Sequence, residues 1–211
     1  MEQKEYMLVL MLNQVSNDGT GVFFYQDSKK EASQASFENS GIIEVSGYNS
    51  KTNAISRGIY LNASGVAKNL SGGTIVVNKG ALGVDVNNKD ATFKNEKGAN
   101  IIVNGESAKN SKDKEVPTTG ILVKTGNQKT ENNGYIEVNQ ISGEGAVGIQ
   151  VNDGKATNNG DIVVNAGKYT SGMKTDGKNS TIENNGNVTI IGDGQTSNGM
   201  IAQNQGTTIN N

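Results

Sequence analysis

The sequence predicts an all-β protein: a single-stranded, right-handed parallel β-helix of about seven coils, with about three short strands in each coil. Three observations predict this fold: an internal repeat of about 30 residues, apolar residues that alternate with polar ones, and turns rich in glycine and asparagine. The clearest repeat unit, ENNGYIEVNQ, begins at Glu131, and near-copies begin at Glu38, Thr157 and Glu183. A catalytic motif is normally written once, so a motif written four times indicates a building unit.

The first landmark of each repeat is a glycine followed by an apolar residue, and in most repeats a second apolar residue follows two places later. The spacings between these glycines are those of solenoid proteins, which repeat every ~20–50 residues. A propeller blade has four strands and needs ~40–50 residues, so a β-helix fits better. The glycines predict coils that begin near Gly21, Gly58, Gly83, Gly120, Gly148, Gly172 and Gly199.

The second landmark is an asparagine followed by a glycine and an apolar-x-apolar strand. In the unit above, Ile136 and Val138 are expected to point into the core and Glu137 to solvent, because side chains alternate along a strand. The glycine before them predicts a corner that accepts no Cβ atom. A single coil leaves its apolar side uncovered. Stacked coils cover one another and join their apolar sides into one core.

Identical asparagines in stacked strands form amide ladders, in which each side chain donates to one neighbour and accepts from another. The alternative is that a line of amides contacts sugar hydroxyls. The predicted ladder consists of Asn39, Asn69, Asn95, Asn132, Asn158, Asn184 and Asn211. A second set, directly after the apolar-x-apolar strands, is Asn78, Asn104, Asn139 and Asn165.

Composition excludes several function classes. The 211 residues include 28 Gly and 30 Asn but no Cys, His or Trp, so disulfides, thiol nucleophiles and histidine chemistry are absent. A net charge of −2 without a basic stripe argues against binding of nucleic acid. Five aspartates fall in different phases of the repeat and form no paired acid/base motif: Asp85, Asp153, Asp161, Asp176 and Asp193. We therefore expect neither an enzyme nor a cofactor or metal site.

Two long repeats carry the predicted insertions, residues 26–36 and 105–119. The second contains the only proline, Pro117, and a run of charged residues: Lys109, Lys112, Asp113, Lys114 and Glu115. These residues are either a solvated surface loop or a recognition loop carried by a rigid rod. The tyrosines Tyr48, Tyr60, Tyr135 and Tyr169 are candidates either for exposed contacts or for capping the core.

The chain divides into an N-terminal strand or cap at 1–20 and repeats at 21–211. Residues 7–12 are apolar, which is far shorter than the ~18 residues of a transmembrane helix, so no membrane span is expected. The run also fits a signal peptide poorly, because Glu2 and Glu5 precede it.

The pattern Gly-Ile-x-Val, a polar loop, then Asn-Asn-Gly-x-Ile-x-Val-Asn resembles the passenger domains of bacterial type V autotransporters. Its Asn-rich, Lys-containing form is most similar to the large autotransporter adhesins of fusobacteria, and the resemblance covers residues 21–211. Haemagglutinin-like exoproteins of two-partner secretion share the architecture. The resemblance implies a right-handed β-helix on the bacterial surface or outer membrane, or secreted, that mediates adhesion to a host-cell or bacterial receptor or glycan.

From this resemblance we expect the chain to be a segment of a longer passenger. The segment would be a rigid stalk that displays loops. An open sheet edge at residue 211 would allow end-to-end self-association. Two alternatives stay open. One is a β-helix protein that binds or cleaves polysaccharides, and the other is a purely structural matrix component without a receptor.

Overall fold

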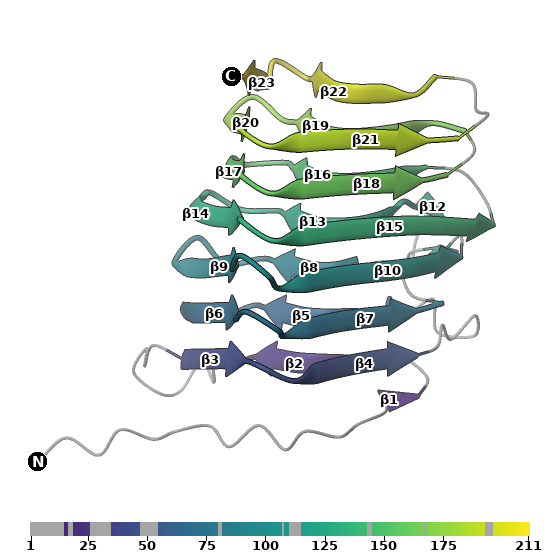
Figure 1. Cartoon of the computed structure of the whole chain (residues 1–211). Helices are drawn as coiled ribbons and strands as arrows, with labels where there is room; N and C mark the ends of the chain where they lie inside the picture. The colour runs from purple at the N-terminus through teal and green to yellow at the C-terminus, as the bar shows by residue number, and fades with distance from the viewer. Residues whose placement is uncertain are drawn as a thin grey trace, which may run out of the picture.

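A computed structural model describes residues 15–16, 19–25, 35–46, 55–79, 82–106, 108–109, 115–142, 145–166, 168–192 and 196–211. Within these residues every regular element is a β-strand. Three parallel sheets of seven strands each run along the molecule, and the chain visits them in turn as it climbs from the N-terminal to the C-terminal end (Figure 1). The predicted all-β solenoid with three strands per coil is confirmed.

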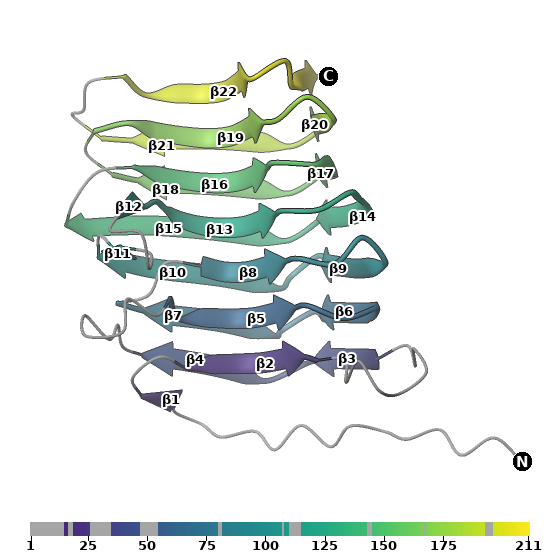
Figure 2. The ribbon, with the colours of Figure 1, turned by 180° about the vertical axis from the view of Figure 1, so that it is seen from behind.

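We name the sheets by their place in Figure 1. The front sheet comprises β1 (Val15–Ser16), β4 (Ile42–Ser46), β7 (Thr74–Asn78), β10 (Asn100–Glu106), β15 (Tyr135–Ser142), β18 (Asp161–Asn165) and β21 (Asn187–Ile191). The back sheet, nearest the viewer in Figure 2, comprises β2 (Thr20–Phe24), β5 (Arg57–Leu61), β8 (Leu82–Val86), β13 (Thr118–Val123), β16 (Ala146–Val151), β19 (Thr170–Asp176) and β22 (Asn198–Gln203). The side sheet comprises β3 (Ala35–Asn39), β6 (Gly65–Asn69), β9 (Ala91–Asn95), β14 (Asn127–Asn132), β17 (Gly154–Asn158), β20 (Ser180–Asn184) and β23 (Thr207–Asn210).

The coils wind in the order back, side, front. In Figure 1 the front strands run left to right and the back strands return behind them while the chain rises, which makes the solenoid right-handed, as expected. Strands β2 to β21 form six complete coils, and β22 and β23 add two strands of a seventh. Each back strand begins at or within two residues of a predicted coil start.

The N-terminal segment adds a short strand to the stack. Val15 and Ser16 pair with Val45 and Ser46, which extends the front sheet below β4. The remainder of the predicted cap, residues 1–14 and 17–18, lies outside the described residues.

The core is a single column of Ile, Val, Leu, Phe and Ala side chains, together with Met173, between the three sheets. The front strands stay in register over their apolar residues, so Ile75, Ile101, Ile136 and Ile162 lie one above another and all are fully buried. The narrow column explains how a chain that is only 33% hydrophobic folds.

The repeated back-sheet glycines exist because the front and back sheets approach closely. A Cβ atom on Gly148 would lie 2.3 Å from Ile162 Cγ2 and 2.5 Å from the carbonyl oxygen of Gly172 in the next coil. Gly58, Gly83, Gly120 and Gly172 meet equivalent obstacles. In these coils the first sequence landmark is therefore a packing requirement, whereas a Cβ atom on Gly199, in the last coil, would meet no described atom within 4 Å.

Candidate functional site

A buried amide ladder lies inside the corner between the side and front sheets. Each Asn Nδ2 donates to Oδ1 of the asparagine one coil further on, at 2.7–2.9 Å, from Asn39 through Asn69, Asn95, Asn132 and Asn158 to Asn184. Each of these side chains is at most 5% exposed. The same amides also donate to carbonyl groups of the turn that follows, for example Asn158 to Gly160 at 3.1 Å. The ladder thus satisfies buried polar groups within the protein.

The assignment of Asn211 to this ladder was wrong. Asn184 donates to Asn210 at 2.8 Å, and Asn210 is the residue in register with it. Ile209, two residues before Asn211, is 40% exposed, whereas Thr208 pairs with buried Ile182. A slip of one residue along a strand exchanges its two faces.

Asn211 belongs to an outer ladder that the sequence reasoning missed. It donates to Asn185, Asn185 to Asn159, and Asn159 to Asn133, at 2.7–2.8 Å on the exposed side of the same corner. The signal was present in the doubled asparagines of the repeat motif. The second predicted set also forms a ladder, in which Asn165, Asn139 and Asn104 each donate to the asparagine one coil back, ending at Asn78.

The three corners of the solenoid differ in how much the length of the connection between strands varies from coil to coil. Every side-to-front connection has two or four residues. The front-to-back connections range from three residues, as at 143–145, to eleven at 107–117. The predicted insertion at 26–36 lies between β2 and β3, and only its last two residues, in β3, are described.

The predicted recognition loop lies at the front-to-back corner. Its ends form an antiparallel hairpin of β11 (Ala108–Lys109) and β12 (Glu115–Val116), in which Lys109 pairs with Glu115. Lys112, Asp113 and Lys114 lie outside the described residues. Thr119 Oγ1 donates to the carbonyl oxygen of Pro117 at 3.0 Å, which fixes the point where the loop rejoins the back sheet.

The outer face of the back sheet is more buried than the outside of a solenoid normally is. Leu82, Leu122 and Val147 are at most 7% exposed, yet none belongs to the central core cluster. Leu122 lies between the inward-facing Ile121 and Val123, so alternation points it outward. This face therefore carries a second, shallow apolar layer, which the sequence pattern did not predict.

A charged and aromatic cluster occupies the N-terminal part of this face. The fully buried Asp85 carboxylate accepts hydrogen bonds through Oδ2 from Arg57 Nε at 2.7 Å and Lys124 Nζ at 2.8 Å. Its Oδ1 is buried without a partner among the described residues. The Arg57 guanidinium lies 4.6 Å from the Tyr60 ring centre, and Tyr60 stacks on Phe23 at 5.1 Å.

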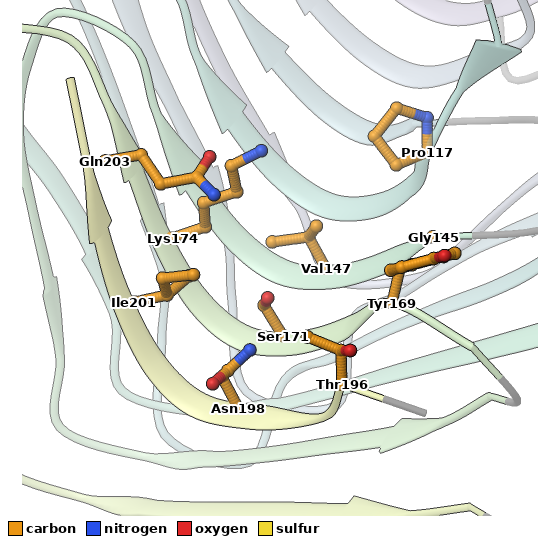
Figure 3. Close-up of a pocket in the computed structure, with 10 residues that line it drawn as sticks. All are labelled: Pro117, Gly145, Val147, Tyr169, Ser171, Lys174, Thr196, Asn198, Ile201 and Gln203. Atoms are coloured by element: carbon orange, nitrogen blue, oxygen red, sulfur yellow. The ribbon is translucent and has the colours of Figure 1, made fainter. Parts of the chain in front are cut away.

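A hollow of about 350 Å³ opens at the C-terminal part of the same face (Figure 3). Ligand pockets in proteins span about 300–1,000 Å³, so the hollow is large enough for a small ligand. Its floor is formed by side chains of three successive back strands, and its rim by residues of the front-to-back corner. The lining residues are Pro117, Gly145, Val147, Tyr169, Ser171, Lys174, Thr196, Asn198, Ile201 and Gln203.

Tyr169 stands at the rim in a backbone conformation that is unusual for its type. Its φ is 56°, and Gly145, at the equivalent place one coil earlier, has a φ of 85°. Both residues directly precede a back strand. A bulky residue in the left-handed region is strained by roughly 1 kcal/mol or more. Strain of this kind concentrates at functional sites.

The predicted absence of paired carboxylates concerns five aspartates, of which Asp193 lies outside the described residues. Of the others, Asp85 is in the ion cluster, Asp153 accepts from the Gly126 amide, Asp161 from Asn187, and Asp176 from Asn204. Within the part of the chain that is described, no three His, Cys, Asp or Glu side chains gather as a metal site would require. That part also has no helix able to cross a membrane.

Ionisable groups with shifted pKa values lie on the other two sheets. Burial raises the pKa of the Tyr135 hydroxyl, and its hydrogen bond to Glu137 acts in the same direction. The Lys155 ammonium, 2.9 Å from Glu183, lowers the pKa of that carboxyl by hydrogen bonding and by its charge. Neither group lines the hollow.

The fold and its ladders define the class of protein as a right-handed parallel β-solenoid. No known family model matches the chain, and neither a curated protein nor a solved structure is significantly similar to it.

Proposed function

We propose that this chain is a structural and adhesive segment of a bacterial surface protein, of the kind displayed by autotransporter passengers. In this proposal the solenoid is a rigid stalk and the front-to-back corner presents the binding elements. In this proposal the chain acts outside the cell, at the outer membrane or after release.

The observation that carries this proposal is the contrast between uniform stacking and localised variation. Side-to-front corners repeat with almost no change in length, whereas the front-to-back corner carries the eleven-residue connection with its hairpin. Binding residues are commonly placed on variable loops that a rigid scaffold positions. The charged residues of the predicted recognition loop occupy this connection.

A polysaccharide-binding protein is the second candidate, and the hollow on the back sheet is the observation that favours it. An exposed tyrosine and several amide and hydroxyl groups around a concave surface suit a sugar better than they suit a flat protein partner. Binding of a sugar without cleaving it is compatible with both candidate functions, because adhesion to a glycan-coated surface is also sugar binding.

The test exploits the regular register of the coils. Residues 107–116 are replaced by Gly-Glu, so that Gly-Glu-Pro117 imitates the three-residue connection 143–145 of the next coil. Glu106 pairs with Ser142, and Thr118 pairs with Ala146, so both strands keep their ends. We expect adhesion to epithelial or bacterial cells to fall at least tenfold while the thermal midpoint stays within about 2 °C.

A second variant separates charge from loop length. It keeps the length of the connection but replaces Lys109, Lys112, Asp113, Lys114 and Glu115 by serine. If it also loses adhesion, the charges carry recognition. A third variant carries the residues of the connection in scrambled order. If the parent chain and all three variants adhere equally, or if none adheres, the adhesive proposal is wrong and the segment is a stalk alone.

A further inference from the structure

The hollow on the back sheet is built by three coils acting together. Val147, Ser171 and Asn198 lie in register on β16, β19 and β22, and Lys174 and Ile201 form the neighbouring column. Stacked strands lie about 4.8 Å apart, so the floor extends about 10 Å along the rod. That length accommodates one to two pyranose rings.

The two ends of the hollow are lined by different types of residue. Figure 3 shows Tyr169 and Pro117 at one end and Lys174, Gln203 and Ile201 at the other. An aromatic face offers a surface on which the apolar side of a sugar ring can pack, and Ser171, Thr196, Asn198 and Gln203 supply hydroxyl and amide groups.

The described lining of the hollow carries a single charged side chain. Lys174 is that residue among the ten described ones that line the hollow. Its Nζ forms an ion pair with Asp176 Oδ2 at 3.6 Å, which is longer than a hydrogen bond, so the three N–H donors of the ammonium can also serve a ligand carboxylate. A ligand carboxylate would therefore be favoured at this end of the hollow.

The backbone conformation of Tyr169 is independent evidence that the hollow binds a ligand. Its φ of 56° places a large side chain where the previous coil has Gly145 with a φ of 85°. The tyrosine side chain is 52% exposed, so core packing does not explain the choice. An unfavourable backbone conformation that holds an exposed ring over a concave surface points to a ligand that contacts the ring.

We infer that this hollow binds an acidic saccharide: a pyranose ring packs on Tyr169 and a uronate carboxylate pairs with Lys174. This inference deepens the adhesive function proposed above, on which it rests, by naming its ligand class. Binding is reversible and involves no covalent step.

The experiment is isothermal titration calorimetry of the full chain with a trimer of galacturonic acid and with its methyl ester. The ester has the same ring shape and no charge. We expect the acid to bind at least tenfold more tightly than the ester. Tyr169→Gly should weaken both ligands at least tenfold, and Lys174→Gln should weaken the acid alone.

Lys79→Gly is the matched control for Tyr169→Gly. Lys79 has the same left-handed conformation, with a φ of 57°, and lies at the same corner but outside the hollow. Both glycine substitutions relieve backbone strain, so neither should lower the melting temperature. Only the change at Tyr169 should reduce binding, which excludes misfolding as the cause.

Three results would overturn the inference: no binding of either trimer, equal affinity for acid and ester, or unchanged affinity in Tyr169→Gly. Cell adhesion is measured on the same preparations. A chain that adheres to cells but binds neither trimer refutes this site and leaves the adhesive function in place. A chain that binds the acid but adheres to no cell surface refutes the adhesive function instead.

Discussion

The side-to-front corner and the front-to-back corner use the same solenoid geometry in opposite ways. At the first, a continuous buried amide ladder and glycines in contact with the neighbouring coil leave no room for change. At the second, connections of three to eleven residues follow one another, and left-handed backbone occurs at Lys79, Gly145, Tyr169 and Thr196. The first corner holds the coils in register, which frees the second to carry loops and the hollow.

The largest expected effect comes from breaking the buried ladder. Asn132→Ala removes the acceptor of Asn95 at 2.8 Å and the donor to Asn158 at 2.7 Å. Buried polar groups left without partners cost ~1–3 kcal/mol each, so we expect a loss of about 3 kcal/mol in the free energy of unfolding. Denaturant titration followed by circular dichroism measures it.

Asn139→Ala is the control for the ladder. Asn139 also connects two coils, donating to Asn104 and accepting from Asn165, but it is half-buried, so water can replace its partners. We expect a loss of about 1 kcal/mol or less. Equal losses in the two variants would show that the buried ladder has no special role.

A smaller effect is expected from filling the tight corner. A Cβ atom on Gly160 would lie 2.0 Å from the carbonyl oxygen of Gly134, which belongs to rigid backbone of the coil below. Overpacking of this kind costs about 2 kcal/mol, and Gly160→Ala should lower the melting temperature accordingly.

Gly145→Ala makes the same change at the variable corner. The nearest described atom to its added Cβ is Pro117 Cβ at 3.3 Å, a tight contact that a small shift relieves, so the left-handed backbone is the main resistance, at a cost of about 1 kcal/mol. If Gly145→Ala proves more damaging than Gly160→Ala, the contrast between the two corners is refuted.

The smallest effect is the pH dependence of a surface ion pair on the side sheet. Lys155 holds the pKa of Glu183 below its ordinary value. A lowered folded-state pKa stabilises the fold above the unfolded pKa of about 4.3, and this contribution disappears as the pH falls through the folded pKa. We expect the melting temperature of Glu183→Gln to fall slightly less than that of the parent between pH 6 and 3. A steeper fall in the variant would contradict the assignment.

Much of the fold could be read from the chain because each coil repeats the same local requirements. The apolar-x-apolar strands, the back-sheet glycines and the asparagines from Asn39 to Asn184 lie where their spacing placed them. Asn211 was misplaced because two asparagines follow Ile209 and only the pairing of β23 with β20 shows which one faces inward. The charged loop could be located from its length, but its antiparallel hairpin could not.

By itself, the sequence determined the repeat, the number of strands in each coil, most of the inward-facing residues and two of the three asparagine ladders. These depend on alternation along one strand and on copies of the same residue in successive coils. Only the tertiary structure decided that Asp85 is buried between Arg57 and Lys124, and that Pro117, Tyr169 and Lys174 surround one hollow. The physical reason is that these residues come from different coils and differ from one repeat to the next. Their proximity arises from stacking, which brings together residues that no local pattern relates.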